Sequence, residues 1–136
     1  MLGRLLDGVN AYANTGAYTE ASVLTAPPGR LVVMLYDGAI RFLAQATAAM
    51  RAGDRGRMRE RMARAVAIID ELNVTLDMSH GEIPERLRSI YLFCKRELAE
   101  ASMQSEPARV EAVSGLLSEL RESWEMLASR DERLSA

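Results

Sequence analysis

The chain has 136 residues, of which 49% are hydrophobic and only 5% aromatic, and its formal net charge at neutral pH is −2. A chain of this length folds as one domain, and so small a net charge excludes a strong overall field toward nucleic acid or an anionic membrane. The apolar residues are mostly Ala, Leu, Met, Val and Ile, which are typical of helices, so the composition favours an all-α protein.

The compartment follows from cysteine usage and from the start of the chain. Cys94 is the single cysteine, so no internal disulfide can form and the cytoplasm is the expected location. Residues 1–22 lack the basic start and the apolar run of a signal peptide. No stretch reaches the roughly 18 uncharged apolar residues of a membrane span, so we expect no membrane insertion.

The first segment, residues 1–26, mixes short apolar residues with small and polar ones and has no sustained period. We predict that it forms an amino-terminal strap, with a short helix or turn near residues 3–12. The strap is expected to dock on the remainder of the chain as a cap.

Four breaks, each containing a glycine or a proline, divide the rest of the chain at residues 26–29, 53–56, 80–84 and 105–107. Between the breaks, apolar residues recur three and four positions apart, as on one face of a helix. This spacing predicts helices near residues 28–52, 55–79, 84–105 and 107–130. Because the connections are short, we expect an antiparallel, up-down-up-down four-helix bundle over residues 27–130, followed by a flexible tail at 131–136.

The predicted helices carry more apolar residues than a bundle requires. Residues 31–36 are apolar on every side of the first helix, whereas a bundle helix needs only one apolar stripe. The excess residues are candidates for contact with a partner or with the strap. In the four helices, these candidates are Val32, Val33, Tyr36, Val66, Val74, Met78, Tyr91, Leu92 and Phe93.

Two interpretations of this excess remain open. In the first, the strap and the width of the bundle cover it permanently. In the second, the strap is removable, and an amphipathic helix or extended segment of a partner takes its place. The two interpretations differ only in whether a partner segment can displace the strap.

The sequence offers little for catalysis. A metal site in a helical bundle needs several helix-borne carboxylates and histidines, and His80 is the only histidine. Cys94 falls on the inner stripe of its helix with no histidine close in sequence, so it is not a candidate nucleophile. We therefore expect no catalytic residue, no metal and no cofactor, and we expect that the protein is not an enzyme.

An arginine-rich run supports one alternative function. Residues 51–64 contain six arginines against Asp54 and Glu60, so an RNA-binding bundle that uses Arg51–Arg64 is conceivable. The run has no interleaved aromatic residue for base stacking, which favours a surface without nucleic acid.

Several segments carry a family resemblance. Residues 31–43 read LVVMLYDGAIRFL and follow VLTAPP at 23–28, and later segments read AIIDEL at 67–72 and EAVSGLLSELRESW at 111–124. In this order and spacing, these segments resemble the flagellin export chaperones of the FliS family, over residues 9–128. One departure is Pro27, which stands where the family usually has a serine that can cap the first helix.

The resemblance implies a four-helix bundle with an amino-terminal cap. It also implies that the chain binds the disordered carboxy-terminal segment of flagellin, prevents its premature polymerisation in the cytoplasm and delivers it to the flagellar export gate. Residue by residue, the resemblance places Val9, Tyr12 and Tyr18 in the segment that covers the client site and docks to the gate.

Overall fold

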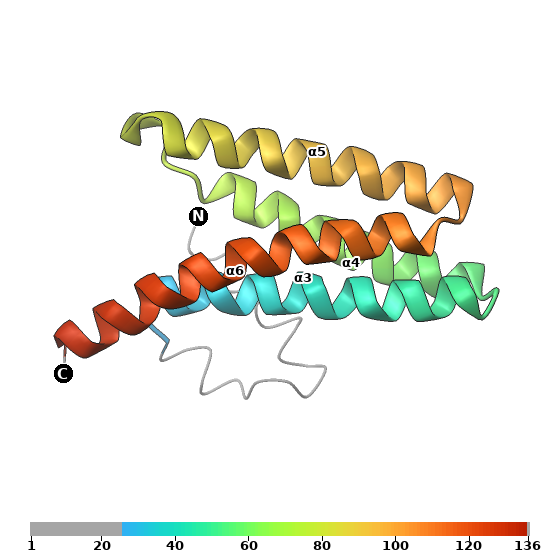
Figure 1. Cartoon of the computed structure of the whole chain (residues 1–136), viewed down its shortest axis with the longest axis horizontal. Coiled ribbons are helices and arrows are strands. Elements are labelled where there is room, and N and C mark those ends of the chain that lie inside the picture. Colours follow the sequence, from blue (N-terminus) through green and yellow to red (C-terminus); the bar gives the residue numbers. More distant parts are fainter. Residues whose placement is uncertain (1–25, 136) are drawn as a thin grey trace.

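The computed structural model describes residues 26–135, which form four long helices and contain no strand (Figure 1). The long helices are α3 (Pro28–Arg51), α4 (Arg55–Val74), α5 (Glu82–Gln104) and α6 (Pro107–Ser135), and the short 3₁₀ helix η1 (Met78–His80) precedes α5. The predicted all-α four-helix bundle is confirmed. Residues 1–25 of the predicted strap lie outside the described part of the chain.

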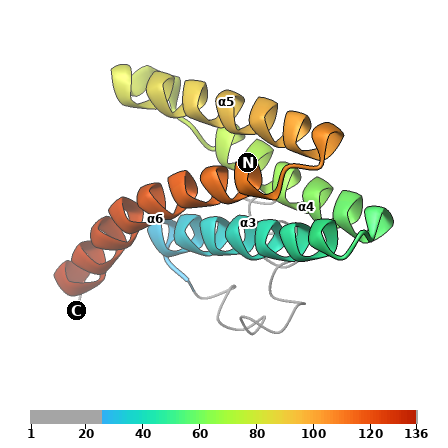
Figure 2. The same cartoon turned by 45° about the vertical axis from the view of Figure 1, so that its right-hand side comes forward.

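Contacts between helices define the bundle. Helix α3 packs against α4 and α6, and α5 packs against the same two helices. Arg30 at the start of α3 pairs with Glu125 near the end of α6 at 2.5 Å, whereas Arg51 at the end of α3 pairs with Glu111 near the start of α6 at 2.7 Å. Helices α3 and α6 therefore run in opposite directions, as Figure 1 and Figure 2 show.

Local chemistry accounts for the first two helix boundaries. Pro28 occupies the first turn of α3, where its missing N–H costs nothing, and Pro27 at the N-cap has no side-chain acceptor. After α3, Gly53 adopts a positive φ of 74°, a conformation that glycine reaches without strain. Asp54 then caps α4 by accepting a hydrogen bond from the Arg57 N–H at 3.1 Å. The result is a tight hairpin between α3 and α4.

Helix α4 ends at Val74 rather than near residue 79 as predicted. Beyond Val74, short polar side chains bond to nearby groups and compete with the helical pattern. The Thr75 hydroxyl donates to the Leu72 carbonyl at 2.7 Å, and Asp77 accepts from the Ser79 N–H at 3.0 Å. The connection to α5 is therefore longer than the sequence suggested.

Helix α6 differs from the prediction at its far end. It continues to Ser135, so the residues expected to form a flexible tail are helical over 131–135. Glu132 in this extension forms an ion pair with Arg30 of α3 at 2.6 Å. This pair ties the last turns of α6 to the first turn of α3.

Helix α3 provides the centre of the core. By length and composition alone it could cross a membrane, but its apolar residues are largely buried inside the bundle. Val33 and Tyr36, two of the candidates for contact with a partner or with the strap, are 1% and 0% exposed. Both side chains are enclosed in the bundle, where α3 has neighbouring helices on two sides, and their contact with a partner stays a prediction.

Candidate functional site

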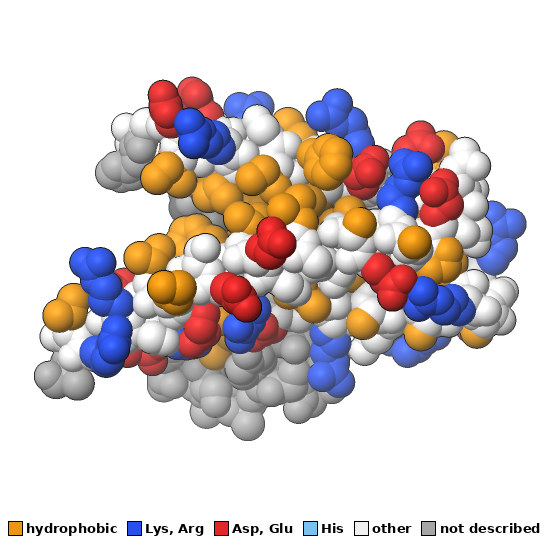
Figure 3. All heavy atoms as spheres, viewed as in Figure 1, with side chains coloured by type: hydrophobic (Ala, Val, Ile, Leu, Met, Phe, Trp, Pro, Cys, Tyr) orange, Lys and Arg blue, Asp and Glu red, His pale blue; other side chains and the backbone are white. Residues whose placement is uncertain are grey.

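An apolar groove lies at the end of the bundle where α3 begins, α4 ends and α5 begins, beside the second half of α6. Its volume is about 750 Å³. In Figure 3, hydrophobic side chains gather in a hollow between α5 and α6. The residues that line the groove are Pro28, Val32, Leu72, Thr75, Leu76, Asp77, Ile83, Pro84, Leu87, Tyr91, Leu120, Ser123, Trp124 and Leu127. All but three of these side chains are apolar, so the groove suits an apolar ligand.

The groove exists because α5 and α6 diverge. At the far end, Glu97 of α5 pairs with Arg109 of α6 at 3.4 Å, so the helices are close there. Toward the start of α5 the two ribbons separate in both views (Figure 1, Figure 2). Ile83, on the side of α5 that faces the bundle, is consequently 70% exposed. Inward-facing residues of both helices are left without a complete cover.

Two buried tyrosines lie beneath the groove. The hydroxyl oxygens of Tyr36 and Tyr91 are 2.5 Å apart, and Tyr91 also lines the groove. Burial raises the pKa of both phenols, and hydrogen bonds to Tyr91 and Trp124 partly offset this effect at Tyr36. Both tyrosines are therefore neutral at physiological pH, and the floor of the groove carries no charge.

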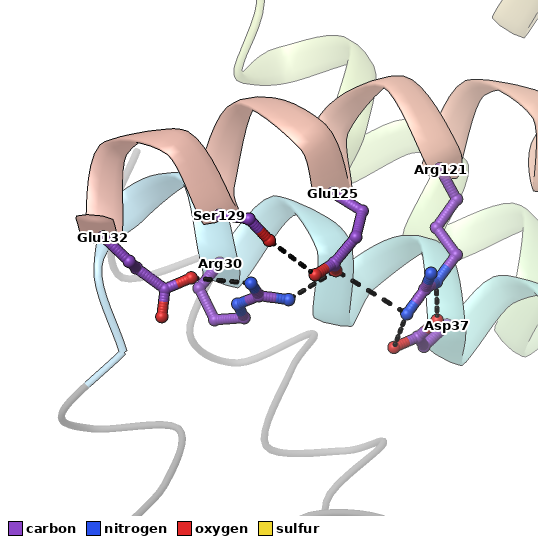
Figure 4. A network of polar contacts seen from close by, with 6 residues as sticks. All are labelled: Arg30, Asp37, Arg121, Glu125, Ser129 and Glu132. Carbon is purple, nitrogen blue, oxygen red and sulfur yellow. Dashed lines mark hydrogen bonds and ion pairs between the residues drawn. The ribbon is translucent and has the colours of Figure 1, made fainter. Parts of the chain in front are cut away.

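An ionic network joins α3 and α6 beside the groove (Figure 4). Arg30 donates to Glu125 at 2.5 Å and to Glu132 at 2.6 Å, while Arg121 pairs with Asp37 and lies 3.8 Å from Glu125. Glu125 also accepts from the Ser129 hydroxyl at 3.1 Å. The hydrogen bond with Arg30 lowers the pKa of Glu125, and the same bond raises the pKa of Arg30.

The predicted site residues separate into several groups. Val32 and Tyr91 line the groove, while Val33 and Tyr36 belong to the core and Val66 is half-buried. The exposed residues Val74, Met78, Leu92 and Phe93 are not among the lining residues. Val9, Tyr12 and Tyr18 lie outside the described residues. The structure thus brings together only part of the predicted set.

Most of the groove was missed by sequence reasoning. Leu76, Leu87, Leu120, Trp124 and Leu127 recur three and four positions apart with the other apolar residues of their helices, and we did not single them out as surface from the sequence. Their spacing gave the correct helix face. It could not show that the faces of α5 and α6 separate at this end of the bundle.

Cys94 is fully buried, as predicted from its place on the inner stripe. Burial raises the pKa of its thiol to about 11, so the thiol is protonated at neutral pH. Among the described side chains, no group of three or more His, Cys, Asp or Glu residues could hold a metal ion.

The arginine-rich run is partly neutralised. Arg51 pairs with Glu111 of α6, and Arg61 and Arg64 both pair with Glu60. The Arg61 guanidinium also lies 5.8 Å from the centre of the Phe42 ring on α3. These contacts engage half of the arginines of the run within the protein itself.

Comparison with known proteins assigns the family. The model of the family described as "Flagellar protein FliS" matches residues 9–131. The flagellar secretion chaperone FliS of Salmonella typhimurium is 34% identical over 90% of this chain and 91% of its own length. The protein of the same name from Bacillus subtilis is 33% identical over 86% of each chain, and the flagellar secretion chaperone FliSB of Pseudomonas aeruginosa is 33% identical over 78% of this chain and 85% of its own.

These names describe chaperones rather than enzymes, and they give the RNA-binding alternative no support. A bundle with an open apolar groove fits a protein that holds a segment of another chain. Together, the family match over most of the chain and the relatives above 30% identity show that this chain belongs to the FliS family of flagellar proteins.

Proposed function

We propose that the protein is a flagellar export chaperone that binds the disordered carboxy-terminal segment of flagellin in the cytoplasm. The observation that carries the proposal is the open apolar groove between α5 and α6, in a chain whose relatives are named flagellar secretion chaperones. While the chaperone holds this segment, flagellin cannot use it for polymerisation. We further propose that the complex is delivered to the export gate.

The energetics of such binding favour an apolar groove. A disordered segment loses roughly 1–2 kcal/mol of backbone conformational entropy for each residue that becomes ordered. Each large apolar side chain that leaves water contributes roughly 1.5–3 kcal/mol. A client segment therefore needs several apolar anchors, and the groove offers apolar walls from all four long helices.

The groove can be tested with a matched pair of substitutions on α5. Ile83 lines the groove and Met103 does not, yet both side chains are 70% exposed. Neither Ile83→Asp nor Met103→Asp should disturb the core. We expect Ile83→Asp to weaken binding of a carboxy-terminal flagellin peptide about 10- to 100-fold, and Met103→Asp to leave it unchanged.

The measurement is isothermal titration calorimetry with the peptide, accompanied by circular dichroism of each variant. Equal peptide affinity for both variants would place the client elsewhere on the surface. A flagellin that lacks its carboxy terminus is the complementary control and should not bind. If the truncated flagellin still copurified with the protein, the proposed client segment would be wrong.

We also propose that the amino-terminal segment with Val9, Tyr12 and Tyr18 covers the client site until flagellin arrives. Family resemblance supports this role. Deletion of residues 1–20 should then increase the fluorescence of an added apolar dye at equal helical content. Unchanged dye fluorescence would argue against a covering role.

A further inference from the structure

The second half of α6 has two roles at once. Leu120, Trp124 and Leu127 form one wall of the groove. On the same turns, Arg121 and Glu125 take part in the ionic network with α3 (Figure 4). The wall and the network are thus carried by one stretch of helix, so a shift of that stretch changes both.

Leu120 and Trp124 pack against the core, but beyond Glu125 apolar packing holds α6 only weakly. Ala128 is the one buried residue between Glu125 and Leu134, and it faces Gly29 of α3. Met126, Leu127 and Leu134 are exposed. A single buried methyl group provides little apolar stabilisation, so the position of these turns depends on polar contacts with α3.

Arg30 supplies two of those contacts. One guanidinium nitrogen donates to Glu125 and another to Glu132, so the side chain spans two turns of α6. The Arg30 side chain is 23% exposed, whereas Arg51, in the ion pair at the opposite end of the same helices, is 55% exposed. Water and salt therefore screen the Arg30 contacts less than those of Arg51.

We propose that Arg30 is a positioning residue for the groove. By holding Glu125 and Glu132, it keeps the turns of α6 from Glu125 onward, which include Leu127, at the distance from α3 and α5 at which the walls can enclose an apolar ligand. The affinity of the groove is therefore set in part by side chains of α3 and α6 that do not line it. The biological meaning rests on the proposed function, but the positioning can be tested without flagellin.

The test uses the neutral apolar dye N-phenyl-1-naphthylamine with the full-length protein. Trp124 is the only tryptophan and lines the groove, so quenching of its fluorescence by the dye reports occupancy of this site. We expect Arg30→Gln to raise the dissociation constant of the dye about fivefold or more. Arg51→Gln is the matched control and should not change it.

An engineered disulfide separates positioning from direct contact. A Cβ atom placed on Gly29 lies 3.7 Å from the Cβ atom of Ala128, close to the roughly 3.8 Å typical of disulfides. Gly29→Cys with Ala128→Cys should therefore lock α6 to α3. In the oxidised locked protein, Arg30→Gln should bind the dye as tightly as the locked parent, and reduction should restore the difference.

Three results would overturn the proposal. The first is wild-type dye affinity in Arg30→Gln, and the second is an equal loss in Arg51→Gln. The third is a loss in Arg30→Gln that the oxidised lock does not repair, because Arg30 would then act by direct contact or through general stability. If Arg30→Gln fails to fold, a salt titration of the parent and of the locked protein decides. The dissociation constant of the dye should rise with added salt in the parent but not in the locked protein. An equal dependence on salt in both proteins would overturn the proposal.

Discussion

The hydroxyl oxygen of Tyr36 on α3 lies 2.5 Å from that of Tyr91 on α5, within the core and beneath the groove. The pair connects two helices that meet mainly through their common neighbours α4 and α6. Both side chains are buried, and each hydroxyl is a hydrogen-bond partner of the other.

Removal of one hydroxyl of this pair should lower the free energy of unfolding by more than half of the loss caused by removing both. Tyr91→Phe leaves the Tyr36 hydroxyl without this partner, and we expect a loss of about 1–3 kcal/mol in the free energy of unfolding. The double substitution Tyr36→Phe with Tyr91→Phe should cost less than the sum of the two single ones. Urea unfolding of all four proteins measures this coupling, and strict additivity would show that the hydrogen bond does not contribute.

The same tyrosines predict a loss of stability at alkaline pH. Burial raises their pKa in the folded state above the ordinary value of 10.0, so the unfolded state loses its protons first. Their contribution is fully present below pH 10 and should decline as the pH rises above it. Thermal unfolding from pH 8 to pH 11 should show a smaller decline in Tyr36→Phe/Tyr91→Phe; an equal decline would assign the effect to other groups.

Because of Glu125, we expect the free energy of unfolding to fall as the pH is lowered in the acid range. Its pKa is lowered from 4.5 by Arg30, so its contribution is present above that value and is lost as the pH falls below it. The effect should be modest because the side chain is 33% exposed. The free energy of unfolding between pH 3 and pH 6 should vary less in Glu125→Gln than in the parent. An identical pH profile would contradict the role assigned to this carboxylate.

Ser105 predicts a stabilising substitution. It ends α5 in the left-handed conformation with φ 54° and ψ 58°, which strains any residue with a Cβ atom. Ser105→Gly should raise the free energy of unfolding by about 0.5–1 kcal/mol. Ser89→Gly, at an exposed helical position of α5, should have the opposite sign. Differential scanning calorimetry of both variants gives the comparison, and destabilisation by Ser105→Gly would refute the strain argument.

We expect the thiol of Cys94 to be protected from alkylation in the folded protein. Its thiol is buried, and its pKa is about 11, so almost no thiolate is available at neutral pH. The native protein should resist iodoacetamide for hours and react rapidly once unfolded in urea. Mass spectrometry follows the modification. Rapid labelling of the native protein would mean that α5 opens readily.

The spacing of apolar residues and the glycine or proline in each break correctly predicted four helices. A run of apolar residues does not show how many neighbouring helices will surround it, so the sequence could not tell that Val33 would be enclosed in the bundle. Val33→Asp would place a carboxylate in the core and should unfold the protein.

The groove and the network depend on tertiary geometry. Leu120 and Trp124 have the same spacing whether α5 covers them or diverges from them. Arg30 finds Glu125 and Glu132 at sequence separations of 95 and 102 residues, which no local pattern reveals.

The hairpin around Gly53 has a further consequence. It leaves no slack at that end of the molecule, where the Asp54 N–H also bonds to the Ala49 carbonyl at 2.9 Å. At the other end, residues 75–81 provide a longer link, and α5 already stands apart from α6. The opening of the groove between α5 and α6 therefore lies at the end of the bundle with the longer connection, opposite the tight hairpin at Gly53.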